Sequence, residues 1–111
     1  MQIAVESGRI VHSRGSISSS YPVLEAYEVG DTVLVIYDYM AFPQLGPCRN
    51  LFAYSAKTGL ELWRAQDIGQ GQVDAYTNFI SEAPLVVGNF AGYSCELDIA
   101  TGQVVNKVFT K

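Results

Sequence analysis

The sequence contains few residues of the kinds that bind metals or form disulfides. Its 111 residues include two cysteines and one histidine, which are Cys48, Cys95 and His12. No C-x-x-C spacing brings metal ligands together, so the sequence does not predict a zinc site. In a reducing compartment we expect two free thiols, with Cys95 buried in a strand; a disulfide between the two cysteines is the alternative.

Long apolar runs are also missing. No stretch approaches the roughly 18 uncharged apolar residues that a membrane-spanning helix needs. The first residues, MQIAVESGRIVHSR, reach Glu6 and Arg9 before an apolar run of signal-peptide length can form. We therefore expect a cytoplasmic protein without a membrane partner.

Basic residues are absent from two long stretches of the chain. No lysine or arginine lies between Arg14 and Arg49 or between Arg64 and Lys107, and the net charge is −4. The acidic residues in these stretches are Glu25, Glu28, Asp31, Asp38, Asp67, Asp74, Glu82, Glu96 and Asp98. Such a surface repels phosphate backbones, which argues against a nucleic-acid partner and favours a basic protein. Ordinary solubility charge is the alternative explanation.

A helical pattern is absent as well. Apolar residues recur with a period near two along almost the whole chain, and the β-branched run VLVIY at 33–37 predicts a buried strand. Residues 21–28 fit either a single helical turn or an extended segment. The serine-rich stretch 16–20 is typical of a flexible loop. The predicted fold class is all-β, with antiparallel strands.

One pattern occurs twice in the sequence. Residues 54–64 are YSAKTGLELWR, and residues 97–107 are LDIATGQVVNK. In both, an alternating stretch enters a Thr-Gly pair and alternation resumes after it, so Gly59 and Gly102 are expected to supply the positive φ of a hairpin turn. A weaker third copy, Glu-Ser-Gly, stands at 6–8.

These copies predict the organisation of the chain. A lone hairpin cannot bury its apolar face in water, so such units must stack on one another. We predict a single β domain over 1–111, with repeat units at about 30–66 and 73–109 preceded by an N-terminal hairpin. The architecture expected from two such units is a partial β-propeller or a twisted β-sandwich.

The repeat resembles the blade of quinoprotein-type (PQQ-type) β-propellers, in which a strand passes through a Thr-Gly turn into a strand bearing tryptophan. Residues 54–59 with Trp63 match this pattern, and residues 97–102 match it without the tryptophan, because Asn106 stands there. A complete propeller needs at least four blades of about 40 residues, and this chain has room for about two and a half. We therefore expect propeller-like blades without the central quinone, and no cofactor.

The whole chain also resembles small bacterial proteins that are encoded beside polymorphic toxins and suspected of being immunity proteins. The shared motifs are YPV-x-EA-x-E-x-GD at 21–31, N-L-x-A-Y at 50–54, PL at 84–85 and C-x-[LI]-D-x-x-TG at 95–102. This resemblance implies a protein that binds and neutralises a toxin domain.

Catalytic signatures are weak throughout. Glu25 and Glu28 have the residue types of an acid–base pair, yet nothing else indicates a sugar cleft around them. Serines lie near His12, but no G-x-S-x-G nucleophile elbow is present. We predict that the protein is not an enzyme.

Two loops stand out as candidate interfaces. Residues 38–47, DYMAFPQLGP, join two strands yet carry large apolar side chains, so this loop should either pack on the core or meet a partner. Residues 66–78, QDIGQGQVDAYTN, combine glycines with acidic residues. The predicted partner-binding residues are Asp38, Tyr39, Phe42, Asp67, Asp74 and Tyr76.

The predicted function is that of a non-catalytic protein-binding module, an immunity protein that neutralises a basic toxin domain such as a nuclease. The alternative is a structural or assembly module, a half-propeller completed by self-association into a homodimer.

Overall fold

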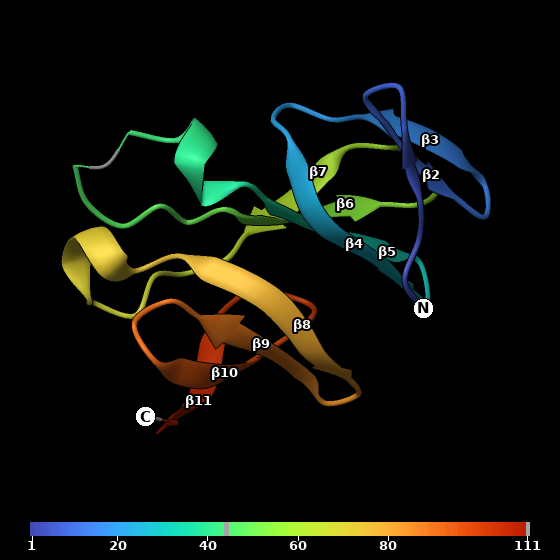
Figure 1. The fold of residues 1–111 in the computed structure, drawn as a ribbon. Helices are drawn as coiled ribbons and strands as arrows, with labels where there is room; N and C mark the ends of the chain where they lie inside the picture. The colour runs from blue at the N-terminus through green and yellow to red at the C-terminus, as the bar shows by residue number, and fades with distance from the viewer. Residues whose placement is uncertain (44, 111) are drawn as a thin grey trace.

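Three antiparallel β-sheets follow one another along the chain (Figure 1). A computed structural model describes residues 1–43 and 45–110. The N-terminal sheet contains β1 (Val5–Glu6), β2 (Arg9–His12) and β3 (Gly15–Ser18). The middle sheet contains β4 (Val23–Val29), β5 (Thr32–Tyr37), β6 (Leu51–Ser55) and β7 (Glu61–Arg64). The C-terminal sheet contains β8 (Tyr76–Glu82), β9 (Leu85–Asn89), β10 (Tyr93–Leu97) and β11 (Val104–Phe109). Two short 3-10 helices, η1 (Tyr39–Ala41) and η2 (Gly71–Val73), lie in the loops.

The middle and C-terminal sheets are two copies of one four-stranded meander, in which each strand pairs with the next along the chain. Their Thr-Gly turns share the same hydrogen bonds. The N–H of Gly59 donates to the carbonyl of Ser55 at 2.8 Å, and the N–H of Gly102 donates to the carbonyl of Asp98 at 2.7 Å. The φ angles of Gly59 and Gly102 are +75° and +76°, which confirms the positive φ expected of both.

The middle sheet is buried on both faces, which explains the apolar run of β5. Leu34 and Ile36 pack in one cluster with Val87 and Cys95 of the C-terminal sheet. Val33, Val35 and Tyr37, from the opposite face of the strand, pack with Ile10 and Ile17 of the N-terminal sheet. The two apolar clusters therefore lie on either side of the middle sheet, one shared with the C-terminal sheet and the other with the N-terminal sheet.

Two local predictions need correction. The first unit begins at β4, earlier than predicted, because residues 23–29 are extended and pair with β5. The serine-rich stretch contains strand β3 and is not simply a loop, since Ile17 is buried between exposed Ser16 and Ser18. The N-terminal hairpin is thereby extended to a three-stranded sheet.

The fold class is all-β, as predicted, and the two meanders with their N-terminal sheet are consistent with either a partial propeller or a twisted sandwich. Within the described ranges, no helix has the length and apolar character needed to cross a membrane.

Candidate functional site

The two loops singled out by composition lie side by side at one end of the middle and C-terminal sheets (Figure 1). The first joins β5 to β6, and the second joins β7 to β8. They are tied together by the backbone N–H of Cys48, which donates to the carbonyl of Asp74 at 2.9 Å. The surface that they form with the β9–β10 turn is called the loop face; it comprises residues 38–43, 45–48, 70–75 and 89–91.

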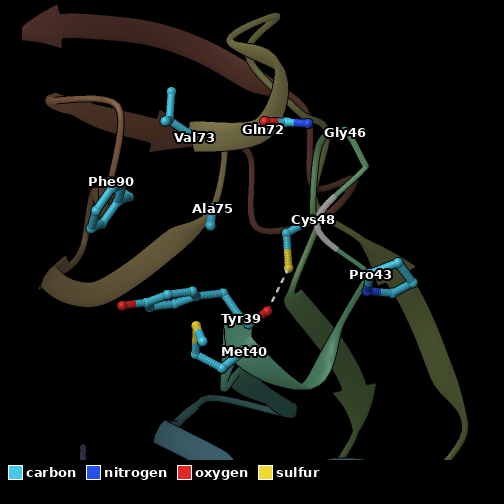
Figure 2. Close-up of a pocket in the computed structure, with 9 residues that line it drawn as sticks. All are labelled: Tyr39, Met40, Pro43, Gly46, Cys48, Gln72, Val73, Ala75 and Phe90. Carbon is cyan, nitrogen blue, oxygen red and sulfur yellow. Dashed lines mark hydrogen bonds between the residues drawn. The ribbon is translucent and has the colours of Figure 1, made fainter.

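The loop face contains a largely apolar cavity of about 420 Å³ (Figure 2). Several large side chains at it are exposed: Met40 is 69% exposed, Phe90 53% and Val73 47%. The rings of Tyr39 and Phe90 lie next to each other in its wall, tilted by 44° with centroids 5.8 Å apart. The lining residues are Tyr39, Met40, Pro43, Gly46, Cys48, Gln72, Val73, Ala75 and Phe90.

The first loop is held in shape from within. The side chain of Asp38 accepts a hydrogen bond from the N–H of Met40 at 2.9 Å and so caps η1. The side chain of Phe42 turns away from solvent, and its ring lies 4.3 Å from that of Tyr21. Gln44, which belongs to the predicted interface loop, lies outside the described residues.

Two arginines brace the same loop at its base. Arg49 donates to the carbonyls of Ala65 and Arg64 at 3.0 and 3.1 Å. Arg64 donates in return to the carbonyls of Arg49 and Cys48 at 2.7 and 2.9 Å. The Arg64 guanidinium also lies over the ring of Phe52, 4.9 Å from its centroid. This reciprocal pair fixes the end of β7 against the loop that leads into β6.

The second loop is organised around a buried carboxylate. Asp74 is only 1% exposed. Its Oδ2 accepts hydrogen bonds from the N–H groups of Ile68 at 2.8 Å and Gln70 at 3.0 Å, and its Oδ1 accepts from the Asn89 side chain at 3.0 Å. Buried carboxylates need such donors to offset desolvation. Asp74 therefore stabilises the loop from inside and is not a surface contact, contrary to the prediction.

Tyr76 and Phe42, which were also predicted to contact a partner, are buried. Tyr76 is fully buried, and its hydroxyl donates to the carbonyl of Gln66. Its backbone N–H and carbonyl both bond to the side chain of Asn50 at 2.8 Å, which joins the middle and C-terminal sheets. Phe42 is 9% exposed. Tyr76 belongs to the core as the first residue of β8, and Phe42 belongs to it because the apolar loop 38–47 folds back onto the core.

Asp38, Tyr39 and Asp67 remain partly exposed. Asp38 and Tyr39 belong to the loop face, and Tyr39 lines its cavity. Asp67 instead lines a shallower hollow beside the first residues of β11, and its Oδ2 accepts from the N–H of Gly69 at 3.1 Å. The structure thus brings the two loops together without gathering all three residues at one point.

Sequence reasoning missed Val73 and Phe90, and it treated Met40 only as part of a loop. Phe90 carried a usable signal, since a large aromatic residue in the turn NFAG at 89–92 is unusual among polar turn residues. Val73 had no such signal, because its exposure depends on how Asp74 folds the loop.

Cys48 places a thiol at the wall of the cavity. Burial raises the pKa of this thiol, and the nearby carboxylates of Asp38 and Asp74 raise it further against the opposing effect of Arg64. A neutral thiol is a weak nucleophile. Across the described part of the chain, no group of three or more histidine, cysteine or acidic side chains is placed to hold a metal ion.

Comparisons with known proteins bear on the fold and the family. No curated protein matches the chain. The crystal structure of the computationally designed Ika8 protein matches it with a TM-score of 0.52 and 15% identity, covering 98% of this chain and 36% of that one. The chain thus spans about a third of that protein, and a likeness at this identity shows the fold alone. A family model described as a domain of unknown function, DUF7957, matches residues 2–109. The chain therefore belongs to the DUF7957 family.

Proposed function

We propose that this chain is a non-catalytic module that binds a basic protein through its loop face. Its role would be that of an immunity protein that neutralises a basic bacterial toxin domain, such as a nuclease. The observation that carries the proposal is the apolar cavity bordered by the exposed side chains of Met40, Val73 and Phe90. Methionine and aromatic residues are enriched at the centres of protein interfaces, where pockets receive a partner's anchor side chains.

The charge around the loop face supports a cationic partner. Asp38 lies at its edge, and Asp67 lies on the adjoining part of the second loop. The whole chain carries a net charge of −4. Exposed charges of one sign steer an oppositely charged partner and raise its association rate, whereas the apolar centre sets how long the complex lasts.

Internal hydrogen bonds also hold the described parts of both loops. Asp74 holds the second loop through three hydrogen bonds, and the Arg49–Arg64 pair braces the first. Binding to a surface that is already ordered costs less conformational entropy than binding to mobile loops. This order favours tight recognition of one partner.

The proposal is tested by recovering the partner and then measuring its complex. The tagged protein is cross-linked in its native host, the captured proteins are identified by mass spectrometry, and a cationic candidate is purified. We expect it to bind the wild-type chain directly, to lose its toxic activity on binding, and to associate more slowly as salt rises, since exposed charges are screened within about 8–10 Å.

Matched variants locate the interface. Met40→Asp should weaken binding by about tenfold or more, mainly by raising the off-rate. Leu60→Asp is the control, because Leu60 is 68% exposed, like Met40 at 69%, but belongs to the β6–β7 turn. Asp67→Lys should slow association. The proposal fails if the host yields no cationic partner whose activity the chain inhibits. It also fails if Met40→Asp binds as tightly as Leu60→Asp.

A further inference from the structure

A second interaction surface follows from how the sheet edges are protected. An edge strand presents unpaired backbone N–H and C=O groups, and native proteins usually protect them with short strands, irregular register, charges or covering segments. In the described part of the chain the edge strands are β1, β3, β4, β7, β8 and β11. Of these, β11 has the longest stretch without such protection.

The edges formed by β4 and β8 are covered by other groups or have irregular register. Residues 1–3 lie along β4. The N–H of Ile3 donates to the carbonyl of Ala26, and the N–H of Glu28 donates to the carbonyl of Met1, both at 2.9 Å. Strand β8 has two register shifts, and the N–H of Phe79 is taken by the carboxylate of Glu25 at 2.7 Å. Neither edge offers a continuous row of free backbone groups.

The remaining protected edges are short or charged. Strand β1 has two residues, and β3 has four, with Ser16 and Ser18 bound by the side chain of Arg9. Strand β7 has four residues, carries Glu61 and Arg64, and pairs with β6 across a register shift.

Strand β11 has irregular register only at its start, where its pairing with β10 shifts between Glu96 and Leu97. It has six residues, VVNKVF, and its register with β10 is regular from Asn106 to Phe109. Val105 and Phe109 are each 58% exposed, and Val108 is 55% exposed. Its one charge, on Lys107, is turned away from the edge, because the ammonium donates to the carbonyl of Ile68 at 3.3 Å. The charge of Lys107 therefore does not prevent another strand from pairing with this edge.

The free backbone groups can be assigned from the ladder. Tyr93 lies opposite Phe109, and the next pair outward is hydrogen-bonded, since Thr110 N–H donates to the carbonyl of Gly92 at 2.8 Å. Bonded and non-bonded pairs alternate in an antiparallel ladder. The backbone groups of Val108 therefore point to β10, and those of Lys107 and Phe109 point outward, where they meet no partner among the described residues.

We propose that β11 pairs antiparallel with β11 of a second copy, which makes a homodimer with one continuous sheet across the two-fold axis. A strand that pairs antiparallel with its own copy is self-complementary, as a two-fold interface requires. In the register centred on Val108, Lys107 and Phe109 bond to the partner's Phe109 and Lys107. Val108 then lies opposite the partner's Val108 in a non-bonded pair, where side chains approach most closely.

This dimer differs from a propeller completed by self-association, because it joins edges and leaves the sheet faces uncovered. It is also independent of the loop-face proposal, since β11 supplies none of the residues that line that cavity. Failure of one proposal therefore leaves the other standing.

The test is the mass in solution as a function of concentration, measured by sedimentation velocity against a monomer mass of 12.1 kDa. The wild type should reach the dimer mass. Val108→Lys places two ammonium groups opposite each other and should weaken dimerisation by about tenfold or more. Leu62→Lys on β7 is the matched control, because Leu62 is 53% exposed, and this variant should dimerise like the wild type.

Amide hydrogen exchange locates the interface in the same samples. Exchange at Lys107 and Phe109 should slow as the wild-type concentration rises and should stay fast in Val108→Lys, whereas the Val108 amide, which bonds to β10, should be protected in both. Circular dichroism checks that each variant keeps its fold. A wild type that stays monomeric at millimolar concentration overturns the proposal. The proposal also fails if Val108→Lys leaves the dimer intact, or if Leu62→Lys abolishes it equally. It fails as well if the backbone amides of Lys107 and Phe109 still exchange fast in the dimer.

Discussion

The indole of Trp63 lies so close to Gly102 that a β-carbon at Gly102 would come within 2.4 Å of ring atom Cε3. Trp63 belongs to the outermost strand of the middle sheet, and Gly102 to the last turn of the C-terminal sheet. The indole Nε1 donates to the carbonyl of Ile99 in the same turn at 2.7 Å. The C-terminal sheet has Asn106 at the position equivalent to Trp63, and a β-carbon at Gly59 would meet nothing within 4 Å.

The two turn glycines should respond differently to one substitution. Gly59→Ala should lower the free energy of unfolding by roughly 1–2 kcal/mol, because alanine is strained at positive φ. Gly102→Ala bears the same strain and must also displace Trp63, so it should cost about 1–3 kcal/mol more. Equilibrium urea denaturation measures both values.

A double-mutant cycle isolates the ring contact. In the Trp63→Ala background, Gly102→Ala should cost no more than Gly59→Ala costs in the wild type. The coupling to Trp63 is the difference between the cost of Gly102→Ala in the wild type and its cost in the Trp63→Ala background. Equal costs for the two glycines in the wild-type background would contradict the close approach of Trp63 to Gly102.

Replacing Trp63 by alanine should remove the main side-chain link between the outer parts of the two sheets. The ring is 8% exposed, and Trp63→Ala should cost about 3–5 kcal/mol, a large part of the stability of a small domain. Because the chain has one tryptophan, native fluorescence reports on it directly. We expect blue-shifted emission that iodide quenches weakly, and red-shifted, readily quenched emission would place the ring on the surface.

The turns could be predicted from the sequence because their determinants are local. Ser55 and Asp98 occupy equivalent positions, and each side chain accepts a hydrogen bond from the N–H two residues later, at 3.1 and 2.9 Å. Residue type and spacing within a few positions specify this geometry. The antiparallel meander then follows from the alternating stretches on either side of each turn.

The candidate site could be predicted only in part, because burial depends on distant residues. Asp74 and Asp67 look alike in sequence, since both are acidic residues near glycines. Only Asp74 accepts a hydrogen bond from the side chain of Asn89, at the end of β9, and this contact accompanies its burial. Likewise, the sequence shows that the loop 38–47 is unusually apolar, but it does not distinguish Phe42, which packs on the core, from Met40, which does not.

The different environments of Asp74 and Asp67 predict different costs of removing each carboxylate. Asp74→Ala leaves three donors without their acceptor and should lower stability by about 3 kcal/mol or more. Asp67→Ala removes one local hydrogen bond at a partly exposed position and should cost less than about 1 kcal/mol. Thermal and urea unfolding of the two variants provide the comparison. Similar losses in both would contradict the central role of Asp74 in the second loop.

Asp31 links three parts of the chain and should make stability depend on pH. Hydrogen bonds from Arg14 and Lys57 lower the pKa of its carboxyl below the ordinary 3.8. A group whose pKa is lower in the folded state stabilises the fold above its unfolded pKa and loses that effect as pH falls through the folded pKa. Wild type should therefore be slightly more stable than Asp31→Asn at pH 6, and the difference should decrease as the pH falls below 3.8 and shrink in high salt. A difference that does not decrease between pH 6 and the lowest pH at which the protein stays folded would rule out this ion pairing as its source.

The two thiols should report on the core and on the loop face separately. Burial raises the pKa of Cys95 from 9.0 to about 11, which lowers its thiolate fraction at pH 8 about a hundredfold. Because Cys95 is fully buried, a thiol reagent should label it only after unfolding.

Cys48 is 8% exposed at the cavity wall and should react slowly in the native protein. Cys48→Ser should abolish the native-state labelling and leave one reactive thiol in urea. In the wild type, a partner bound at the loop face should suppress the native-state labelling of Cys48. Rapid native labelling of Cys95 would show that the C-terminal sheet opens more readily than its packing implies, and labelling of Cys48 that ignores a bound partner would place the binding surface elsewhere.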